Sequence, residues 1–341
     1  MRQGCFSLRW FLLLPFILLT ACRSAPPTLK IGLVAPFEGL HRPLGYEALF
    51  AVKLALQEQN RQGGIHGYRL ELVALNDFDD PAEAAVQARA LITDPDVVGV
   101  VGHFTPAATL SALPEYRRAG LPAVIPWPVP ADALHGQTAV CITATSDELS
   151  ARLQTLLAGI PPEAVLTIPH PDAFVPPPTP PSAILLTGDG VAAGETLRHL
   201  QNAGLNGLPR FAAAEAGSPQ LVQVAREAAN GLRYVSPGPA PADIEAGDFA
   251  QAYQALAGFP PGPRAVLAYD ATRVLLSAIA AAVGPSTPPS RAAVAAALPA
   301  VQITGLTGPI RFDPRGYRET APIWIYQIDS GQYPGKLLVY Q

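Results

Sequence analysis

Short apolar runs alternate along the chain with segments in which apolar residues recur every three or four positions. The run 29–36, LKIGLVAP, is apolar almost throughout and ends at a proline, which is typical of a strand covered on both faces. The segment 45–59 that follows has three apolar side chains on one helical stripe, and Gly63 and Gly64 end it. A buried strand followed by an amphipathic helix predicts a βα unit.

This alternation continues beyond the first unit. Further strands are expected at 68–75, 96–101, 121–126, 183–188, near Phe211 and at 232–237. The helix after the second strand has the clearest start, because Asp80 can cap it, Pro81 suits its first position and Glu83 can complete a capping box. Ser146 can cap a further helix that runs through Leu157. Strands that alternate with helices imply parallel βαβ units with right-handed crossovers, so a three-layer α/β fold is expected.

Proline interrupts the alternation in one place. The chain has 38 prolines in 341 residues, and a dense group of them, PHPDAFVPPPTPPS, lies between Leu157 and the strand at 183–188. Only one strand is expected in this interval. The group is most simply an extended polyproline connection and not a domain boundary. The total length by itself predicts two domains of roughly 150 residues.

The first residues have the pattern of an export signal. Residues 1–21 combine a basic start, an apolar stretch at 10–19 that is too short to span a bilayer comfortably, and a small-residue exit. The sequence LTAC that ends at Cys22 resembles the bacterial lipobox. We therefore expect a lipoprotein signal peptide at 1–21, lipidation of Cys22 and a tether at 22–28, which anchors the protein to the outer side of a membrane. The alternative is an ordinary cleaved signal peptide that happens to end in cysteine.

Charge and cysteine content argue against a nucleic-acid-binding protein and against a disulfide-stabilised protein. The formal net charge is −4, so nothing attracts nucleic acid. Beyond Cys22, Cys141 has no partner, so packing and not a disulfide framework must stabilise the fold.

No catalytic or metal-binding motif is present in the sequence. It contains no GxSxG elbow, no HExxH, no Walker loop and no paired cysteines. The acidic group Asp77, Asp79 and Asp80 resembles a cation site, but the start of a capped helix explains it. We therefore expect no enzyme, no metal site and no cofactor.

The run VVGVVGHFTPAAT at 97–109 leads a buried strand directly into a helix start. In open α/β sheets, ligands bind beyond the carboxyl ends of strands, where helix starts present unpaired N–H groups. Thr105 can cap this helix, and Ala107 and Ala108 supply free N–H groups. We expect a cleft wall that meets a polar or anionic group, although any βα turn has similar features.

Several segments together resemble the leucine/isoleucine/valine-binding protein family. They are IGLVAPFEG, NRQGGIHGYRLELVALNDFDDPAEAAVQARAL, VVGHFTPAAT, AGLPAVIP, RHLQNAGL, AREAANGLRYVSP, AYDATRVLLSAIAAA and TGPIRFDPRGY. The resemblance covers nearly all of the mature chain and is densest in its first part. It implies a type I periplasmic-binding fold of two αβα lobes joined by hinge strands. Lobe 1 would comprise 29–138 plus 264–312, and lobe 2 would comprise 139–263 plus 313–341.

The resemblance also implies ligand-binding residues. Glu215 matches the acidic residue that pairs with the ligand ammonium in the family, and Asp189 could join it. Thr105, Ala107 and Ala108 would hold an anion through the hydroxyl and backbone N–H groups.

The same region departs from the family. Pro106 stands where members often have serine, and proline offers neither a hydroxyl nor an N–H group. Trp127 stands where small residues are usual, so its indole would either fill the ligand space or offer a packing face to a different ligand. Leu44 and Asp189 replace aromatic residues.

The function that the resemblance implies is that of a monomeric, lipid-anchored receptor of an ABC importer. It would bind a branched-chain amino acid or a similar small polar ligand between its lobes and deliver it to a permease in the membrane. Compared with the family, lobe 2 is expected to be one βα unit short. The missing donors and the short lobe favour an alternative, a degenerate member that acts as a sensor or envelope interaction partner without a transported ligand.

Overall fold

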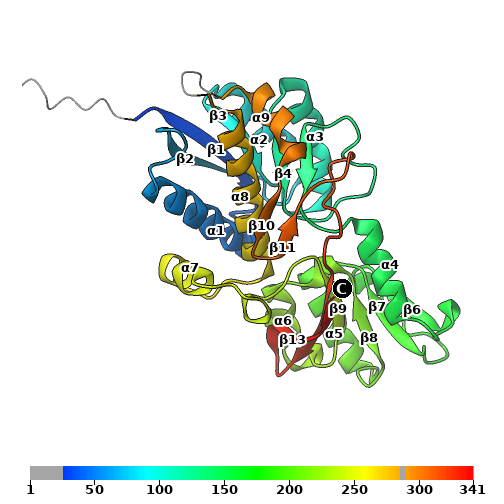
Figure 1. Ribbon diagram of the computed structural model, residues 1–341. Coiled ribbons are helices and arrows are strands. Elements are labelled where there is room, and N and C mark those ends of the chain that lie inside the picture. Colours follow the sequence, from blue (N-terminus) through cyan, green and yellow to red (C-terminus); the bar gives the residue numbers. More distant parts are fainter. Residues whose placement is uncertain (1–25, 285–288, 341) are drawn as a thin grey trace, which may run out of the picture.

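The computed structural model describes residues 26–284 and 289–340. Figure 1 shows two α/β lobes, one above the other, with the chain passing between them more than once. The expected signal peptide at 1–21, the lipidation site Cys22 and most of the tether at 22–28 lie outside the described residues.

The sheet of lobe 1 has five parallel strands in the order β2, β1, β3, β4, β5. Their bounds are β1 Thr28–Ala35, β2 Arg69–Asn76, β3 Val97–Val101, β4 Ala123–Ile125 and β5 Ala139–Cys141. The continuous apolar runs in the sequence form the buried strands β1 and β3 at the centre. The strand order reverses between β1 and β3, which is where ligands bind open α/β sheets.

Helices cover both faces of this sheet, α1 and α8 on one face and α2 and α3 on the other. Their bounds are α1 Arg42–Arg61, α2 Pro81–Thr93, α3 Pro106–Ala119 and α8 Pro263–Ala282. Helix α8 approaches closely at Gly99, where a Cβ atom would lie 2.5 Å from Leu275. Among the described helices, α8 alone is long and apolar enough to cross a membrane, but most of it is buried in this core.

The helix starts follow the local sequence signals only in part. Asp80 caps α2 by accepting hydrogen bonds from two backbone N–H groups, as predicted. Glu83 accepts a hydrogen bond from Gln87 in the next turn, which is not the contact expected of a capping box. Helix α4 (Ser146–Leu156) begins one residue earlier than expected: Thr145 is the cap and forms a reciprocal box with Glu148.

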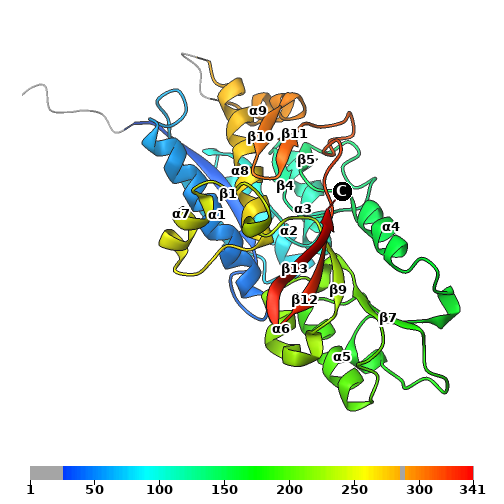
Figure 2. The ribbon, with the colours of Figure 1, turned by 60° about the horizontal axis from the view of Figure 1, so that its bottom comes forward.

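Lobe 2 has a six-stranded sheet in the order β13, β12, β9, β8, β7, β6. The bounds are β6 Val165–Ile168, β7 Ala183–Leu186, β8 Arg210–Ala212, β9 Arg233–Ser236, β12 Trp324–Asp329 and β13 Gln332–Tyr340. Strands β6 to β9 are parallel, and the carboxyl-terminal hairpin β12–β13 adds two antiparallel strands. Figure 2 shows this hairpin beside α6 at the edge of the lobe.

The two faces of the lobe 2 sheet are covered unequally. Helices α5 (Gly190–Asn202) and α6 (Pro219–Ala225) pack on one face, whereas α4 packs on the other against β8 and β9. The connection from β6 to β7 contains a 3-10 turn at Pro171–Ala173 and no α-helix. Its prolines supply no backbone N–H groups for helix formation, which explains why no α-helix forms in this connection.

The crossings between the lobes lie close to the expected positions but not at them. Strand β5 pairs with β4, so the lobe 1 sheet includes three residues beyond the expected boundary at 138. Helix α7 (Phe249–Ala257) packs on α1 of lobe 1, where the Tyr253 hydroxyl donates to the Glu47 carbonyl at 3.0 Å. The remaining elements of lobe 1 are helix α9 (Arg291–Ala297) and the hairpin formed by β10 (Ile303–Gly305) and β11 (Gly308–Ile310).

Candidate functional site

The start of α3 lies at the crevice between the lobes, near His41, but Thr105 does not cap this helix through its side chain. The Thr105 hydroxyl instead donates to Asp79 Oδ1 at 2.6 Å. Asp79 reaches this position because its backbone is left-handed, with a φ of 61°. The expected side-chain cap of α3 is therefore wrong, and Thr105 serves as a link to the loop after β2.

A carboxylate of the protein thus lies at the start of α3. Ala107 is exposed and Ala108 is buried in the first turn of this helix, and Pro106 brings no N–H group. The positive end of a helix dipole favours an anion at this place. Burial nevertheless raises the pKa of Asp79, and the bond from Thr105 and the nearby His41 oppose that rise.

His41 lies between acidic groups of the two lobes. Its Nε2 is 3.7 Å from Asp79 Oδ2 in lobe 1 and 3.8 Å from Asp189 Oδ2 in lobe 2. Asp189 Oδ1 caps α5 by accepting from two backbone N–H groups. The structure therefore brings Asp189 close to the Asp79–Thr105 pair, and a single histidine spans the gap.

A second contact across the crevice is made by Arg264, which also packs on Trp127 of its own lobe. The Trp127 indole is 2% exposed, and the guanidinium of Arg264 lies 3.8 Å from the ring centre. Arg264 Nη1 also donates to the Gly217 carbonyl of lobe 2 at 3.0 Å. Trp127 Nε1 and Arg264 Nε have no hydrogen-bond partner among residues 26–284 and 289–340.

Arg264 was not predicted as a site residue. The only signal in the sequence is a single arginine at the start of the apolar segment PRAVLAYDATR. An arginine is almost never fully buried without a partner, yet periodicity cannot show which group it would meet.

Glu215 follows β8, the strand next to β7 in the lobe 2 sheet. It is half-buried in the 3-10 turn Ala214–Ala216 after β8 and lines a small cavity of about 50 Å³. The opposite wall of this cavity is α4, through Ser150 and Leu153 among others. The turn that carries Glu215 lies beside the start of α5, which Asp189 caps, because a Cβ atom on Gly190 would lie 3.1 Å from the Ala216 carbonyl oxygen.

A buried pair supports the lobe 1 side of the crevice. His103 Nδ1 lies 2.7 Å from Asp77 Oδ2, and His103 Nε2 lies 3.1 Å from the Tyr116 hydroxyl of α3. All three side chains are almost completely buried. His103 therefore connects Asp77, in the loop that also carries Asp79, to Tyr116 of α3.

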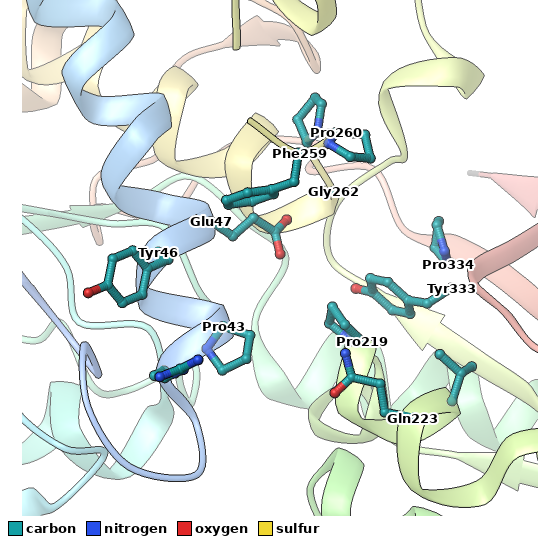
Figure 3. Close-up of a pocket in the computed structure, with 13 residues that line it drawn as sticks. Pro43, Tyr46, Glu47, Pro219, Gln223, Phe259, Pro260, Gly262, Tyr333 and Pro334 are labelled. Carbon is teal, nitrogen blue, oxygen red and sulfur yellow. The ribbon is translucent and has the colours of Figure 1, made fainter. Parts of the chain in front are cut away.

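A large cavity between the lobes lies beside this crevice. Its volume is about 690 Å³, and Figure 3 shows walls from α1, from the segment before α8, from α6 and from β13. Glu47 of α1 is 4% exposed at its floor, and its Oε1 accepts from the Ala265 N–H at the start of α8 at 3.0 Å. Burial raises the pKa of Glu47, and the charge of Arg264 opposes that rise.

The described residues hold no group of three or more histidine, cysteine, aspartate or glutamate side chains placed to bind a metal ion. Cys141 is buried, and burial raises the pKa of its thiol. The crevice and the cavity therefore offer hydrogen bonds, charges and packing surfaces.

Comparison with known families decides the relationship. A family model described as Periplasmic binding protein matches residues 28–158 and 180–332. The chain belongs to this family. The matched stretches leave out 159–179, which is the part of lobe 2 that contains the proline-rich connection.

Solved structures show the same fold. A branched-chain amino acid transporter substrate-binding protein from Streptococcus pneumoniae, solved with isoleucine, has a TM-score of 0.78 and 21% identity, covering 92% of this chain and 99% of its own. A leucine-binding protein from Thermotoga maritima has a TM-score of 0.79 and 19% identity, covering 92% and 98%. A solute-binding protein from R. palustris in complex with benzoate has a TM-score of 0.74 and 18% identity, covering 91% and 95%.

Curated relatives match over a shorter stretch. An amino acid binding protein from Pseudomonas aeruginosa is 31% identical over 96 residues, which are 28% of this chain and 26% of its own length. Leu/Ile/Val-binding protein homolog 7 from Brucella melitensis is 33% identical over 105 residues, or 31% and 26%. The match thus spans about a quarter of the length of these relatives.

The resemblance to the leucine/isoleucine/valine-binding family and the two-lobed type I fold are therefore confirmed. Members of this family bind ligands outside the cytoplasm and are not enzymes, which agrees with the expectation from the sequence.

Proposed function

We propose that the chain is the extracytoplasmic substrate-binding protein of an ABC importer and that it captures a small ligand between its lobes. The observation that carries this proposal is the set of contacts across the crevice. Arg264 donates to the Gly217 carbonyl, and Gln220 of α6 donates to the Leu40 carbonyl at 3.2 Å. Lobes that meet through a few polar contacts can open and close, and a ligand that touches both lobes shifts that equilibrium.

The ligand is amino-acid-like or a similar small carboxylate. Relatives named for amino acids and neighbours solved with isoleucine or benzoate support this class. Asp189 and Glu215 are the proposed partners of a ligand cation, and Thr105, Ala107 and Ala108 those of an anion. Trp127 would supply a packing surface.

Membrane attachment through lipidated Cys22, a permease as partner and a monomeric state complete the proposal. Intact-mass measurement of the protein extracted from membranes tests the anchor. A diacylated or triacylated amino-terminal cysteine is the expected result, and an unmodified mature terminus would contradict it.

A thermal-shift screen against amino acids, amides and small carboxylates tests ligand capture. A ligand at a hundredfold excess over Kd adds about 2.7 kcal/mol to the free energy of unfolding. The expected shift in Tm is therefore several degrees. A hit should weaken in Glu215→Ala or Asp189→Asn if these residues hold its cation.

One observation favours a second function, that of a sensor or envelope interaction partner without a transported ligand. Arg264 covers Trp127 and donates across the crevice to the Gly217 carbonyl, so protein groups link the two lobes. A flat screen, together with co-purification of an envelope protein that is not a permease, would support this second function over transport.

A further inference from the structure

We propose that His41 is a pH-sensitive link between the lobes: its protonated imidazole joins Asp79 of lobe 1 to Asp189 of lobe 2 and favours the closed arrangement without a ligand. This inference goes beyond the proposed function, because it concerns the ligand-free protein. It rests on the position of His41 in the crevice and on the two carboxylates that flank it.

His41 lies at a point of the chain from which a side chain reaches both lobes. It ends the loop that leaves the carboxyl end of β1, and it directly precedes α1. It does not cap this helix through its side chain, so the imidazole is available for contacts across the crevice. The side chain is 18% exposed, which means that it is mostly enclosed but still accessible to water and protons.

Two carboxylates lie at nearly equal distances from His41. Asp79 Oδ2 is 3.7 Å from its Nε2, and Asp189 Oδ2 is 3.8 Å from the same atom. Each carboxylate uses its other oxygen within its own lobe. Asp79 Oδ1 accepts from the Thr105 hydroxyl, and Asp189 Oδ1 accepts from two N–H groups at the start of α5. Both carboxylates are therefore held in place independently of the charge on His41.

The charge of His41 decides whether these carboxylates oppose or favour closure. With a neutral imidazole, the closed form brings two negative charges from opposite lobes toward one side chain, and their repulsion favours opening. A protonated imidazole places a positive charge between them and forms an ion pair with each. Only the closed form brings Asp189 to His41, so the closed form binds this proton more tightly. Acid therefore favours closure, and this contribution is lost as the pH rises.

The elements nearest to His41 carry other polar and charged groups. Its own loop and helix contribute Glu38 and Arg42, which are exposed and therefore screened by salt. From lobe 2, Gln220 of α6 donates to the Leu40 carbonyl beside His41, and its amide does not titrate. These three side chains leave the sign of the argument unchanged.

The loop after β2 contributes three carboxylates, those of Asp77, Asp79 and Asp80. Asp77 lies 2.7 Å from the buried His103, and Asp80 caps α2. Burial raises the pKa of Asp79, and nearby positive charges, including that of Arg264, oppose the rise. Asp79 and the His103–Asp77 pair also take up protons in acid, so variants of His41 are needed to separate their effects.

The expected size of the effect is moderate. The Asp189 side chain is 46% exposed, and an ion pair with that exposure changes an equilibrium by up to about fivefold. The contacts across the crevice from Arg264 and Gln220 are also few, so a change of this size can shift the lobes. If Asp189 also holds a ligand cation, as proposed above, protonated His41 competes for the same carboxylate.

Small-angle X-ray scattering of the ligand-free mature protein tests the link at about pH 5.5 and about pH 8, on either side of the range in which histidines change charge. We expect a smaller radius of gyration at the lower pH. In His41→Gln, the side chain still donates a hydrogen bond but does not titrate, so the radius should be equal at both pH values. His170→Gln, at an exposed position between β6 and β7, is the matched control and should respond as the parent does.

Asp189→Asn tests the lobe 2 end of the link. Asparagine caps a helix about as well as aspartate does, so α5 should keep its start. The variant removes the charge that draws lobe 2 toward protonated His41, and its radius of gyration should also become independent of pH. Glu195→Gln, which removes an exposed carboxylate of the same helix, is the control and should keep the response of the parent.

Two results overturn the inference. If His41→Gln contracts in acid as the parent does, another group such as Asp79 or the His103–Asp77 pair drives the change. If the parent has the same radius at both pH values, protonation of His41 does not close the lobes. Neither result bears on ligand capture, which the thermal-shift screen decides separately.

Discussion

The two lobes contain the same βα units, yet they bury their sheets differently. Lobe 1 has at least two helices on each face: α1 and α8, with α9 against α8, on one face, and α2 and α3 on the other. Lobe 2 has α5 and α6 on one face and α4 on the other, because a proline-rich loop joins β6 to β7. The family match omits this loop and resumes after it. The fold therefore tolerates a missing helix when the strand order and the edge that faces the other lobe are kept.

The crevice shows the same asymmetry. Lobe 1 supplies most of its side chains, which are His41, Asp79, Thr105, Trp127 and Arg264. Lobe 2 supplies the Asp189 carboxylate and the Gly217 carbonyl. Lobe 1 thus supplies most of the surface on which lobe 2 closes. Matched substitutions in the two lobes should therefore have unequal effects on stability and on lobe closure.

The largest expected difference is in the cores. Leu275 of α8 is fully buried against Gly99, whereas Leu185 of β7 is 7% exposed and borders a cavity of about 300 Å³ beside α4. Leu275→Ala should lower the free energy of unfolding by about 4 kcal/mol and Leu185→Ala by about 2 kcal/mol, because the second site is less tightly enclosed. Urea unfolding followed by circular dichroism measures both. Equal losses would show that α4 alone packs lobe 2 as well as two helices pack lobe 1.

Arg264 tests whether lobe 1 holds lobe 2 closed. Arg264→Met keeps an unbranched side chain over Trp127 but removes the bond to Gly217, which is worth about 2 kcal/mol for a charged donor. The open form should gain population, and small-angle X-ray scattering should show a larger radius of gyration. Arg273→Met, at an exposed position of the same helix, is the control. A parent-like radius in Arg264→Met would mean that other contacts hold the lobes together.

The sequence predicted lobe 1 more accurately than the crevice. Buried strands and amphipathic helices have periods that can be recognised locally, and most elements lie within a few residues of the predictions. The capping of α3 was wrong because Asp79, 26 residues earlier in the chain, takes the Thr105 hydroxyl. Arg264 and Glu47 were missed because their partners come from distant elements, so no local pattern marks them.

Helix caps should matter more where one helix covers a face. Thr145→Ala removes the box that starts α4 and should cost about 1 kcal/mol, with faster amide hydrogen exchange throughout α4. Asp80→Ala removes the cap of α2, but α3 still packs along that helix, so exchange should rise only in its first turn. An equal rise along both helices would argue that neighbouring helices do not limit the opening.

The smallest effect concerns one pair of polar side chains in each lobe. In lobe 1, Lys30 Nζ lies 2.8 Å from Asp94 Oδ2, and this hydrogen bond holds the pKa of Asp94 below its ordinary value. In lobe 2, Arg233 donates to the neutral side chain of Gln327 at 3.1 Å. A depressed carboxyl pKa stabilises the fold above the ordinary pKa of aspartate, and this contribution is lost as the pH falls through the depressed value.

Asp94→Asn should therefore lower the urea midpoint slightly at pH 7 and leave it unchanged at a pH below the depressed pKa of Asp94. Gln327→Ala removes a contact that does not titrate, so its effect on the midpoint should be the same at both pH values. If Asp94→Asn changed the urea midpoint equally at both pH values, the charge of Asp94 would not contribute to stability through Lys30. The pairs in the two lobes would then show the same pH dependence.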